Sequence, residues 1–146
     1  MYDTILVPLD GSHRAERILP HVEALARANG SRVIFLQVIE PVPVLSTSIG
    51  HAGRIDEAGI REQTAISYLR GWRGEFQAKG IEAASAVEHG AVVPAITRLA
   101  ERENADLIAM ASHGRSGIER AFYGSVTAGV LQRIDRPLLL IRSRGM

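Results

Sequence analysis

The segment that decides the fold is DLIAMASHGRSGIERAFYGSVT, residues 106–127. It begins with a continuous apolar run, Leu107 to Ala111, which predicts a buried strand. It leads into an amphipathic stretch, Ser125 to Ile134, which predicts a helix. Glycine and hydroxyl residues occupy the loop between the two. Such a loop is a natural anion site, because glycine lets the backbone approach a phosphate and a helix N-terminus presents unpaired N–H groups.

The same alternation of strand and helix runs along the whole chain. A stretch with prolines and glycines and little periodicity interrupts it once, and this predicts a long loop from Glu40 to about Arg54. Apolar runs predict strands and amphipathic stretches predict helices. The predicted strands are Thr4–Leu9, Arg32–Ile39, Ile81–Glu88, Leu107–Ala111 and Pro137–Arg142, and the predicted helices run from Ser12 or His13 to Asn29, from Asp56 to Lys79, around Pro94 to Glu103, and from Ser125 to Ile134.

This pattern predicts an α/β fold. Continuous apolar strands separated by helices indicate a parallel sheet that is covered on both faces. Right-handed crossovers make a three-layer, doubly wound sheet of five strands the natural arrangement. With the strand order 3-2-1-4-5, a ligand is expected where the order reverses, between the first and fourth strands. The two most polar loops, at Leu9–Ser12 and after Ala111, follow these two strands.

The composition is that of an ordinary globular protein, with 46% hydrophobic residues, 23% charged residues and a net charge of +1. This charge balance gives no reason to expect a nucleic-acid or membrane surface. The absence of Cys excludes disulfides and thiolate metal sites. The N-terminus has no leader pattern, and no apolar run approaches about 18 residues. We therefore expect one domain, residues 1–146, in the cytoplasm.

Several polar residues of the two loops fit either a ligand site or ordinary loop structure. Asp10 fits an acceptor for a ribose or an adenine amine, and it equally fits a turn residue. Ser125 is placed to cap the last helix, a role that is compatible with phosphate binding. His113 fits a phosphate donor or a structural loop residue. Arg115 and Arg120 fit phosphate screening or simple solvation.

The sequence lacks the motifs of several other well-known binding and catalytic sites. There is no G-x-x-x-x-G-K-[ST] loop and no G-x-G-x-x-G after the first strand. The five histidines show no i, i+4 ligand spacing, so a metal site built by the protein is not expected. No catalytic constellation is apparent. The sequence predicts a binding module more than an enzyme.

The whole chain resembles the universal stress protein family. ILVPLDGS (Ile5–Ser12) resembles the family's first strand and turn, and RPLLLIR (Arg136–Arg142) resembles its ending. The segment that begins at Ala111 is similar to the family's nucleotide signature, G-x-x-G-x9-G-[S/T]. Gly114 and Gly124-Ser125 match this signature, whereas Ala111 occupies the place of its first glycine. The resemblance implies a fold like that of adenine nucleotide alpha hydrolases and membership of the subgroup that binds ATP.

The resemblance also implies a role for each matching residue. Pro8, Leu9 and Asp10 would lie against the adenosine, with Asp10 nearest the ribose, and Val38 would meet the adenine through its backbone. A divalent ion, Mg²⁺ or Mn²⁺, would be carried mainly by the phosphates. The residues implied around the phosphates are Met110 and Ala111 as the floor, Ser112, Gly114 and Arg115 around the α- and β-phosphates, and Gly124, Ser125, Val126 and Thr127 around the far phosphates.

The last strand is expected to pair with a second copy of the chain. The resemblance implies a homodimer through this strand, Pro137 to Arg142. Independently, Leu138 to Ile141 would form an apolar sheet edge with no charge to discourage pairing. We expect an ATP-binding sensor or regulatory module. The alternatives are a slow ATPase or self-phosphorylating enzyme, and a dimeric interaction protein that binds no nucleotide.

Overall fold

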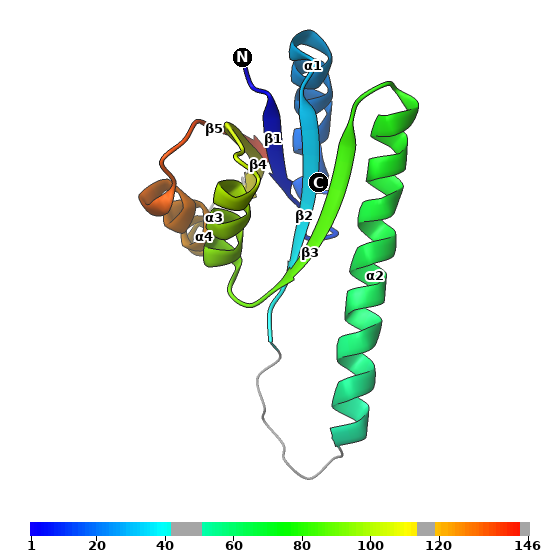
Figure 1. Ribbon diagram of the computed structural model, residues 1–146. Coiled ribbons are helices and arrows are strands. Elements are labelled where there is room, and N and C mark those ends of the chain that lie inside the picture. The colour runs from blue at the N-terminus through cyan, green and yellow to red at the C-terminus, as the bar shows by residue number, and fades with distance from the viewer. Residues whose placement is uncertain (42–50, 114–118, 144–146) are drawn as a thin grey trace.

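The computed structural model describes residues 1–41, 51–113 and 119–143 (Figure 1). Its centre is a five-stranded sheet with the order β3-β2-β1-β4-β5, in which every neighbouring pair is parallel. This confirms the predicted fold class and strand order. The strands are β1 (Thr4–Pro8), β2 (Arg32–Ile39), β3 (Ala83–His89), β4 (Leu107–His113) and β5 (Leu138–Ser143).

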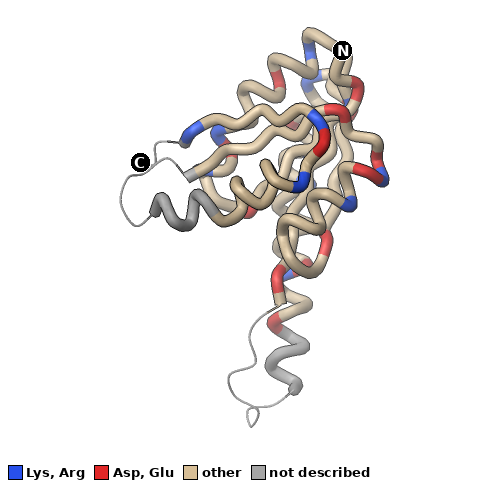
Figure 2. Tube along the Cα trace, turned by 90° about the vertical axis from the view of Figure 1, so that its left-hand side faces the viewer, with Lys and Arg blue, Asp and Glu red and all other residues tan. Residues whose placement is uncertain are grey.

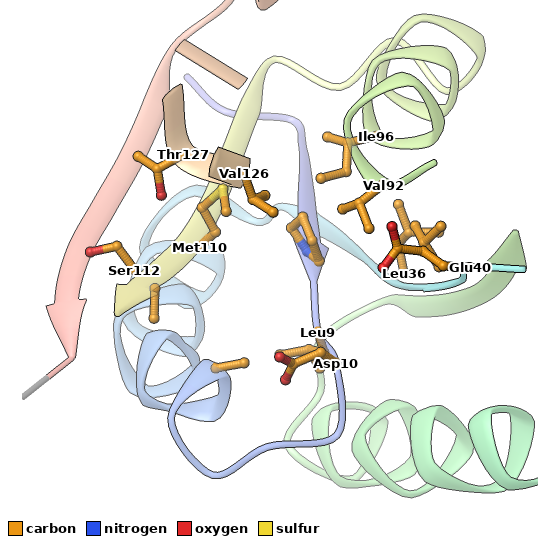
Figure 3. A pocket seen from close by; sticks show the side chains of 14 residues that line it. Leu9, Asp10, Leu36, Glu40, Val92, Ile96, Met110, Ser112, Val126 and Thr127 are labelled. Carbon is orange, nitrogen blue, oxygen red and sulfur yellow. The ribbon is translucent and has the colours of Figure 1, made fainter. Parts of the chain in front are cut away.

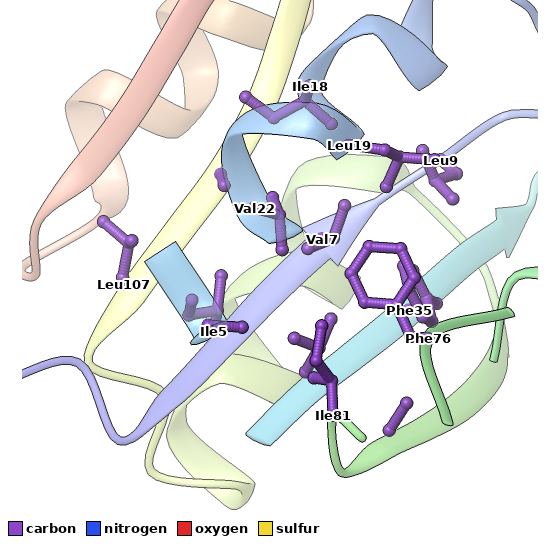
Figure 4. Close-up of a cluster of buried hydrophobic side chains, with 14 of the residues drawn as sticks. Ile5, Val7, Leu9, Ile18, Leu19, Val22, Phe35, Phe76, Ile81 and Leu107 are labelled. Atoms are coloured by element: carbon purple, nitrogen blue, oxygen red, sulfur yellow. The ribbon is translucent and has the colours of Figure 1, made fainter. Parts of the chain in front are cut away.

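Helices cover both faces of the sheet, and each face has its own apolar cluster. On one face, α1 (Leu19–Asn29) and α2 (His51–Ala78) pack on alternate residues of β1 and β2, as Figure 4 shows around Val7 and Phe35. The ring of Phe35 meets Phe76 of α2 edge to face, with the ring centroids 5.0 Å apart. On the other face, α3 (Val92–Arg102) and α4 (Glu119–Arg133) pack on the intervening residues of the strands.

The first helical segment begins later than the sequence pattern predicts. A short 3-10 helix, η1 (Ala15–Ile18), precedes α1. Pro20 lies in the first turn of α1, where its missing N–H costs nothing. The helix ends as predicted at Gly30, whose φ of 67° is the left-handed conformation that glycine adopts most easily.

Two further helices begin well before the predicted residue. The helix α2 begins at His51, inside the stretch predicted as a loop to Arg54; residues 42–50 lie outside the described chain. The helix α4 begins at Glu119 rather than at Ser125. Both differences lengthen a helix at its N-terminus, because the sequence there contains helix-compatible residues next to glycines that weaken the periodicity.

Side-chain hydrogen bonds connect neighbouring segments at the end of the sheet where its strands begin. The Asp106 carboxylate accepts hydrogen bonds from the backbone N–H groups of Asp3, at 2.8 Å, and Thr4, at 3.0 Å. The Arg136 guanidinium donates to the carbonyls of Ala100 and Ala105, each at 2.8 Å. The Ser31 hydroxyl donates to the carbonyl of Tyr2. These contacts tie the segments before β1, β2, β4 and β5 to one another.

Candidate functional site

A pocket of about 250 Å³ lies at the opposite end of the sheet, beyond the carboxyl ends of β1, β2 and β4 (Figure 3). This is the place where the strand order reverses, and it is where doubly wound sheets bind ligands. The helices α3 and α4 supply one wall, and the segment that follows β1 supplies another. The pocket is lined by Pro8, Leu9, Asp10, Ala15, Leu36, Val38, Glu40, Val92, Ile96, Met110, Ala111, Ser112, Val126 and Thr127.

One side of the pocket is apolar. Leu36 and Val38 reach it from β2, and Val92 and Ile96 reach it from α3. Figure 3 shows Leu36, Val92 and Ile96 together on this side, with Glu40 beside them. A flat apolar ring fits against such a surface, because it removes its own faces and these side chains from water.

The other side of the pocket carries hydroxyl groups. Ser112 of β4 and Thr127 of α4 are 3% and 4% exposed and lie on the same side in Figure 3. The Ser112 hydroxyl donates a long hydrogen bond of 3.4 Å to the carbonyl of Ile141. Hydroxyl groups both donate and accept hydrogen bonds, so this side is suited to the oxygen atoms of a polar ligand.

Asp10 stands at the mouth of the pocket and also builds the turn after β1. Its Oδ1 atom accepts hydrogen bonds from the Ser12 N–H, at 2.9 Å, and the Ser12 hydroxyl, at 2.6 Å. Among the described residues, Oδ2 has no hydrogen-bond partner. The turn role proposed for Asp10 is therefore confirmed, and one carboxylate oxygen is still available to a ligand hydroxyl or amine.

Behind the Asp10 turn, a polar network connects η1 to α2. The Tyr68 hydroxyl donates to Oε2 of Glu16, while Oε1 of Glu16 lies 3.3 Å from Nδ1 of His13. Burial raises the pKa of Tyr68, and the Glu16 carboxylate raises it further. The phenol is therefore protonated at any physiological pH and serves as a donor.

Most of the residues predicted from the sequence come together in the pocket. The exceptions belong to the glycine-rich segment: Gly114 and Arg115 lie outside the described chain, the surroundings of His113 and Gly124 are not described, and Ser125 does not line the pocket. The predicted residues that line it are Pro8, Leu9, Asp10, Val38, Met110, Ala111, Ser112, Val126 and Thr127.

The predicted helix cap at Ser125 is wrong. Because α4 begins at Glu119, Ser125 lies inside the helix. Only the N–H groups of the first turn of an α-helix lack an acceptor within it, and the first turn of α4 begins at Glu119. The N–H of Ser125 lies beyond this first turn, so it is not one of the unpaired groups that were expected at the phosphates.

Five lining residues were not found from the sequence: Ala15, Leu36, Glu40, Val92 and Ile96. Leu36 lies two residues before Val38 on one strand, so the period of two would have placed both on the same face. Val92 and Ile96 are four residues apart on α3 and share a helix face. No local signal says which helix face meets the ends of the strands.

Metal ligands are sparse in the described part of the chain. Those residues contain no cluster of three or more His, Cys, Asp or Glu side chains that would hold a metal ion. Asp10 and Glu40 are the acidic residues among the pocket lining.

No helix in residues 1–41, 51–113 and 119–143 is both long and apolar enough to span a bilayer.

Comparison with known proteins places the chain in a family. The model of the universal stress protein family matches residues 1–142. The universal stress protein MJ0577 of Methanocaldococcus jannaschii is 28% identical over 157 residues, an alignment that covers 99% of this chain and 97% of that protein. Its solved structure has a TM-score of 0.80 with this chain, at 26% identity, and covers 100% of this chain and 99% of the other.

Two solved relatives contain nucleotides. A universal stress protein in complex with cAMP has a TM-score of 0.73 at 24% identity and covers 98% of both chains. A universal stress protein family protein of Arabidopsis thaliana with AMP bound has a TM-score of 0.69 at 13% identity, covering 97% of this chain and 92% of the other. These two structures share the fold of this chain. With the family match over residues 1–142, the chain belongs to the universal stress protein family.

Proposed function

We propose that this protein binds ATP at the pocket between β1 and β4 and acts as a nucleotide-dependent regulatory or sensor module. The observation that carries the proposal is the division of one pocket into an apolar side, a carboxylate and a hydroxyl side. Relatives with the same fold were solved with cAMP and with AMP, which supports an adenine nucleotide as the ligand class.

The difference between the two sides of the pocket determines how the nucleotide is oriented in it. The adenine packs between β2 and α3, against Leu36 and Ile96, and the ribose hydroxyls donate to Oδ2 of Asp10. The phosphates point toward Ser112 and Thr127, away from the carboxylates of Asp10 and Glu40. Placing them at the other end would bring like charges together, which is unfavourable in a partly enclosed site.

The residues present fit a divalent ion that is held mainly by the phosphates. The described residues provide no metal cluster of their own. Mg²⁺ or Mn²⁺ bound to nucleotide keeps several water ligands, so it needs few protein ligands. The Ser112 and Thr127 hydroxyls lie on the side where the phosphates are placed. The ion would neutralise phosphate charge that the described lining leaves uncompensated.

Isothermal titration of the protein with Mg-ATP tests the proposal, with ADP, AMP, cAMP and GTP compared under the same conditions. A ligand at 100 times its Kd stabilises the folded state by about 2.7 kcal/mol, so thermal unfolding provides a second readout. We expect saturable binding of the adenine nucleotides and weaker binding of GTP. No heat and no stabilisation at millimolar nucleotide would favour the non-binding interaction protein instead.

A pocket-filling variant locates the site. Val126→Trp on α4 would place an indole inside the pocket and should abolish ATP binding. Leu131→Trp is the matched control, because this side chain is on the same helix but is 59% exposed. Equal loss of binding in both variants, or in neither, would argue against this pocket. Phosphate release measured with wild-type protein distinguishes a binding module from a slow ATPase.

A further inference from the structure

The Tyr68–Glu16 hydrogen bond is the point where α2 holds the segment that lines the nucleotide pocket. Tyr68 lies in the middle of α2, and Glu16 lies in η1, directly after Ala15 of the pocket wall. The Glu16 side chain is only 17% exposed, and its two oxygens are engaged by Tyr68 and His13. A carboxylate this buried depends on these partners.

The segment around Ala15 and Glu16 is also connected to Asp10 by hydrogen bonds through Ser12. The Ser12 hydroxyl donates to Asp10 and accepts a hydrogen bond from the Ala15 N–H at 3.1 Å. The Ser12 carbonyl accepts from the Glu16 N–H at 3.3 Å. A continuous set of contacts thus runs from the carboxylate at the pocket mouth through Ser12 and Glu16 to Tyr68.

Trp72 lies on α2 next to this set of contacts. It lies one turn after Tyr68 on the same helix and is the only tryptophan of the chain. Trp72 and Glu16 both line a second hollow of about 440 Å³ between α1 and α2. The indole therefore reports on the junction between α2 and η1, without lining the nucleotide pocket itself.

We propose that Glu16 and Tyr68 are positioning residues of the nucleotide pocket, and that their hydrogen bond transmits its occupancy to α2. The inference rests on the proposed function. A nucleotide that donates hydrogen bonds to Asp10 stabilises the turn of residues 10–15 in one conformation. This turn then holds Glu16 in hydrogen-bonding position to Tyr68. In return, α2 holds the turn in the conformation that binds, since coupling between two sites is reciprocal.

The shape of α2 makes it a suitable recipient of this signal. Figures 1 and 2 show α2 extending beyond the end of the sheet. Its inner part is anchored by the buried Ala65, Leu69 and Phe76, whereas residues 57–61 are exposed and Ile60 is 65% exposed. Tyr68 lies in the anchored part, between the buried Ala65 and Leu69.

The test combines Mg-ATP titration by calorimetry with the fluorescence emission of Trp72. In wild type, we expect nucleotide to change the emission with the same Kd as the calorimetry. Tyr68→Phe and Glu16→Ala should weaken ATP binding about fivefold, as expected when one hydrogen bond that stabilises the binding conformation is lost, and should remove the emission change. Glu16→Gln keeps an acceptor for Tyr68 and should restore both.

Lys79→Met provides the matched control. Lys79 directly follows α2 and contacts Glu23 of α1 at 2.8 Å, but it lies away from the nucleotide pocket. This variant should bind ATP and change its emission like wild type. If wild type binds ATP but Tyr68→Phe binds it equally with the same emission change, the positioning role is overturned and the proposed function stands. If wild type binds no nucleotide, both are overturned.

Discussion

Gly129 of α4 lies directly against Val93 of α3. A Cβ atom on Gly129 would come within 2.9 Å of Cγ2 of Val93, closer than two carbon atoms tolerate. The two helices approach each other this closely because no side chain separates them at this point. The neighbouring residues Val92 and Val126 line the nucleotide pocket, so this contact sets one of its dimensions.

Gly129→Ala is therefore expected to destabilise the protein, although alanine is the better helix former. Alanine gains about 1 kcal/mol of helix propensity, whereas overpacking costs about 1–3 kcal/mol. We expect a net loss of about 1 kcal/mol in the free energy of unfolding, measured with urea. In a Val93→Ala background, where the clash is absent, the same substitution should become stabilising. A stabilising effect in both backgrounds would contradict the close contact.

The size of residue 111 is expected to control ATP affinity. Ala111 lines the pocket from β4, and a larger side chain there takes space from the ligand. Ala111→Val should weaken binding about tenfold, which corresponds to about 1.4 kcal/mol, and Ala111→Gly should bind at least as tightly as wild type. Ala86→Val, the same change on β3 and outside this pocket, serves as the control. Calorimetry that finds the two valine variants alike would refute the prediction.

Asp106 is expected to make folding stability depend on pH in the acid range. Burial raises its pKa, but the hydrogen bonds from Asp3 and Thr4 outweigh this, and the pKa is lowered. An unfolded Asp has a pKa of about 3.9. The stabilisation is therefore fully present above this value and is lost as the pH falls through the lower folded value.

Asp106→Asn should measure this contribution. At pH 6 we expect the variant to be less stable than wild type by about 1 kcal/mol in urea unfolding, since an amide accepts these hydrogen bonds less well than a carboxylate. The difference should shrink below about pH 4. A difference that stayed constant down to pH 3 would show that protonation of Asp106 has no part in it.

The edge strand β5 is expected to form the interface of a homodimer. It is the last strand of the sheet, and Leu138 to Ile141 are all partly exposed. Leu140→Lys should shift the protein toward monomer in light scattering after gel filtration, because charge at an edge opposes pairing while the aliphatic stem still packs. Leu131→Lys on α4 controls for added charge. A wild-type monomer at all concentrations would refute the prediction.

The sequence predicted the sheet well because its strands carry their own signal. Runs such as Ile5–Leu9 and Val33–Leu36 are apolar throughout, as strands buried on both faces must be. The start of α4 was missed because Gly124 interrupts the periodicity, although an α-helix tolerates one glycine at a cost of about 1 kcal/mol.

The sequence predicted most of the pocket residues that lie at the ends of strands, and it missed those that come from the helix α3. Asp10 and Ser112 lie at strand ends, and topology alone brings these ends together. Val92 and Ile96 reach the pocket only because α3 packs at one particular rotation over β2 and β4. That rotation depends on contacts between distant residues, which no local pattern contains.

Because all five strands run in the same direction, the two ends of the sheet differ. Side-chain hydrogen bonds crosslink the end where the strands begin, and the pocket lies at the end where they finish. Asp106, Arg136 and Ser31 bind neighbouring segments together where the strands begin. Substitutions in the turns around the pocket can therefore alter what is recognised without loosening the contacts that hold the strands in register, and this leaves the binding end free to diversify.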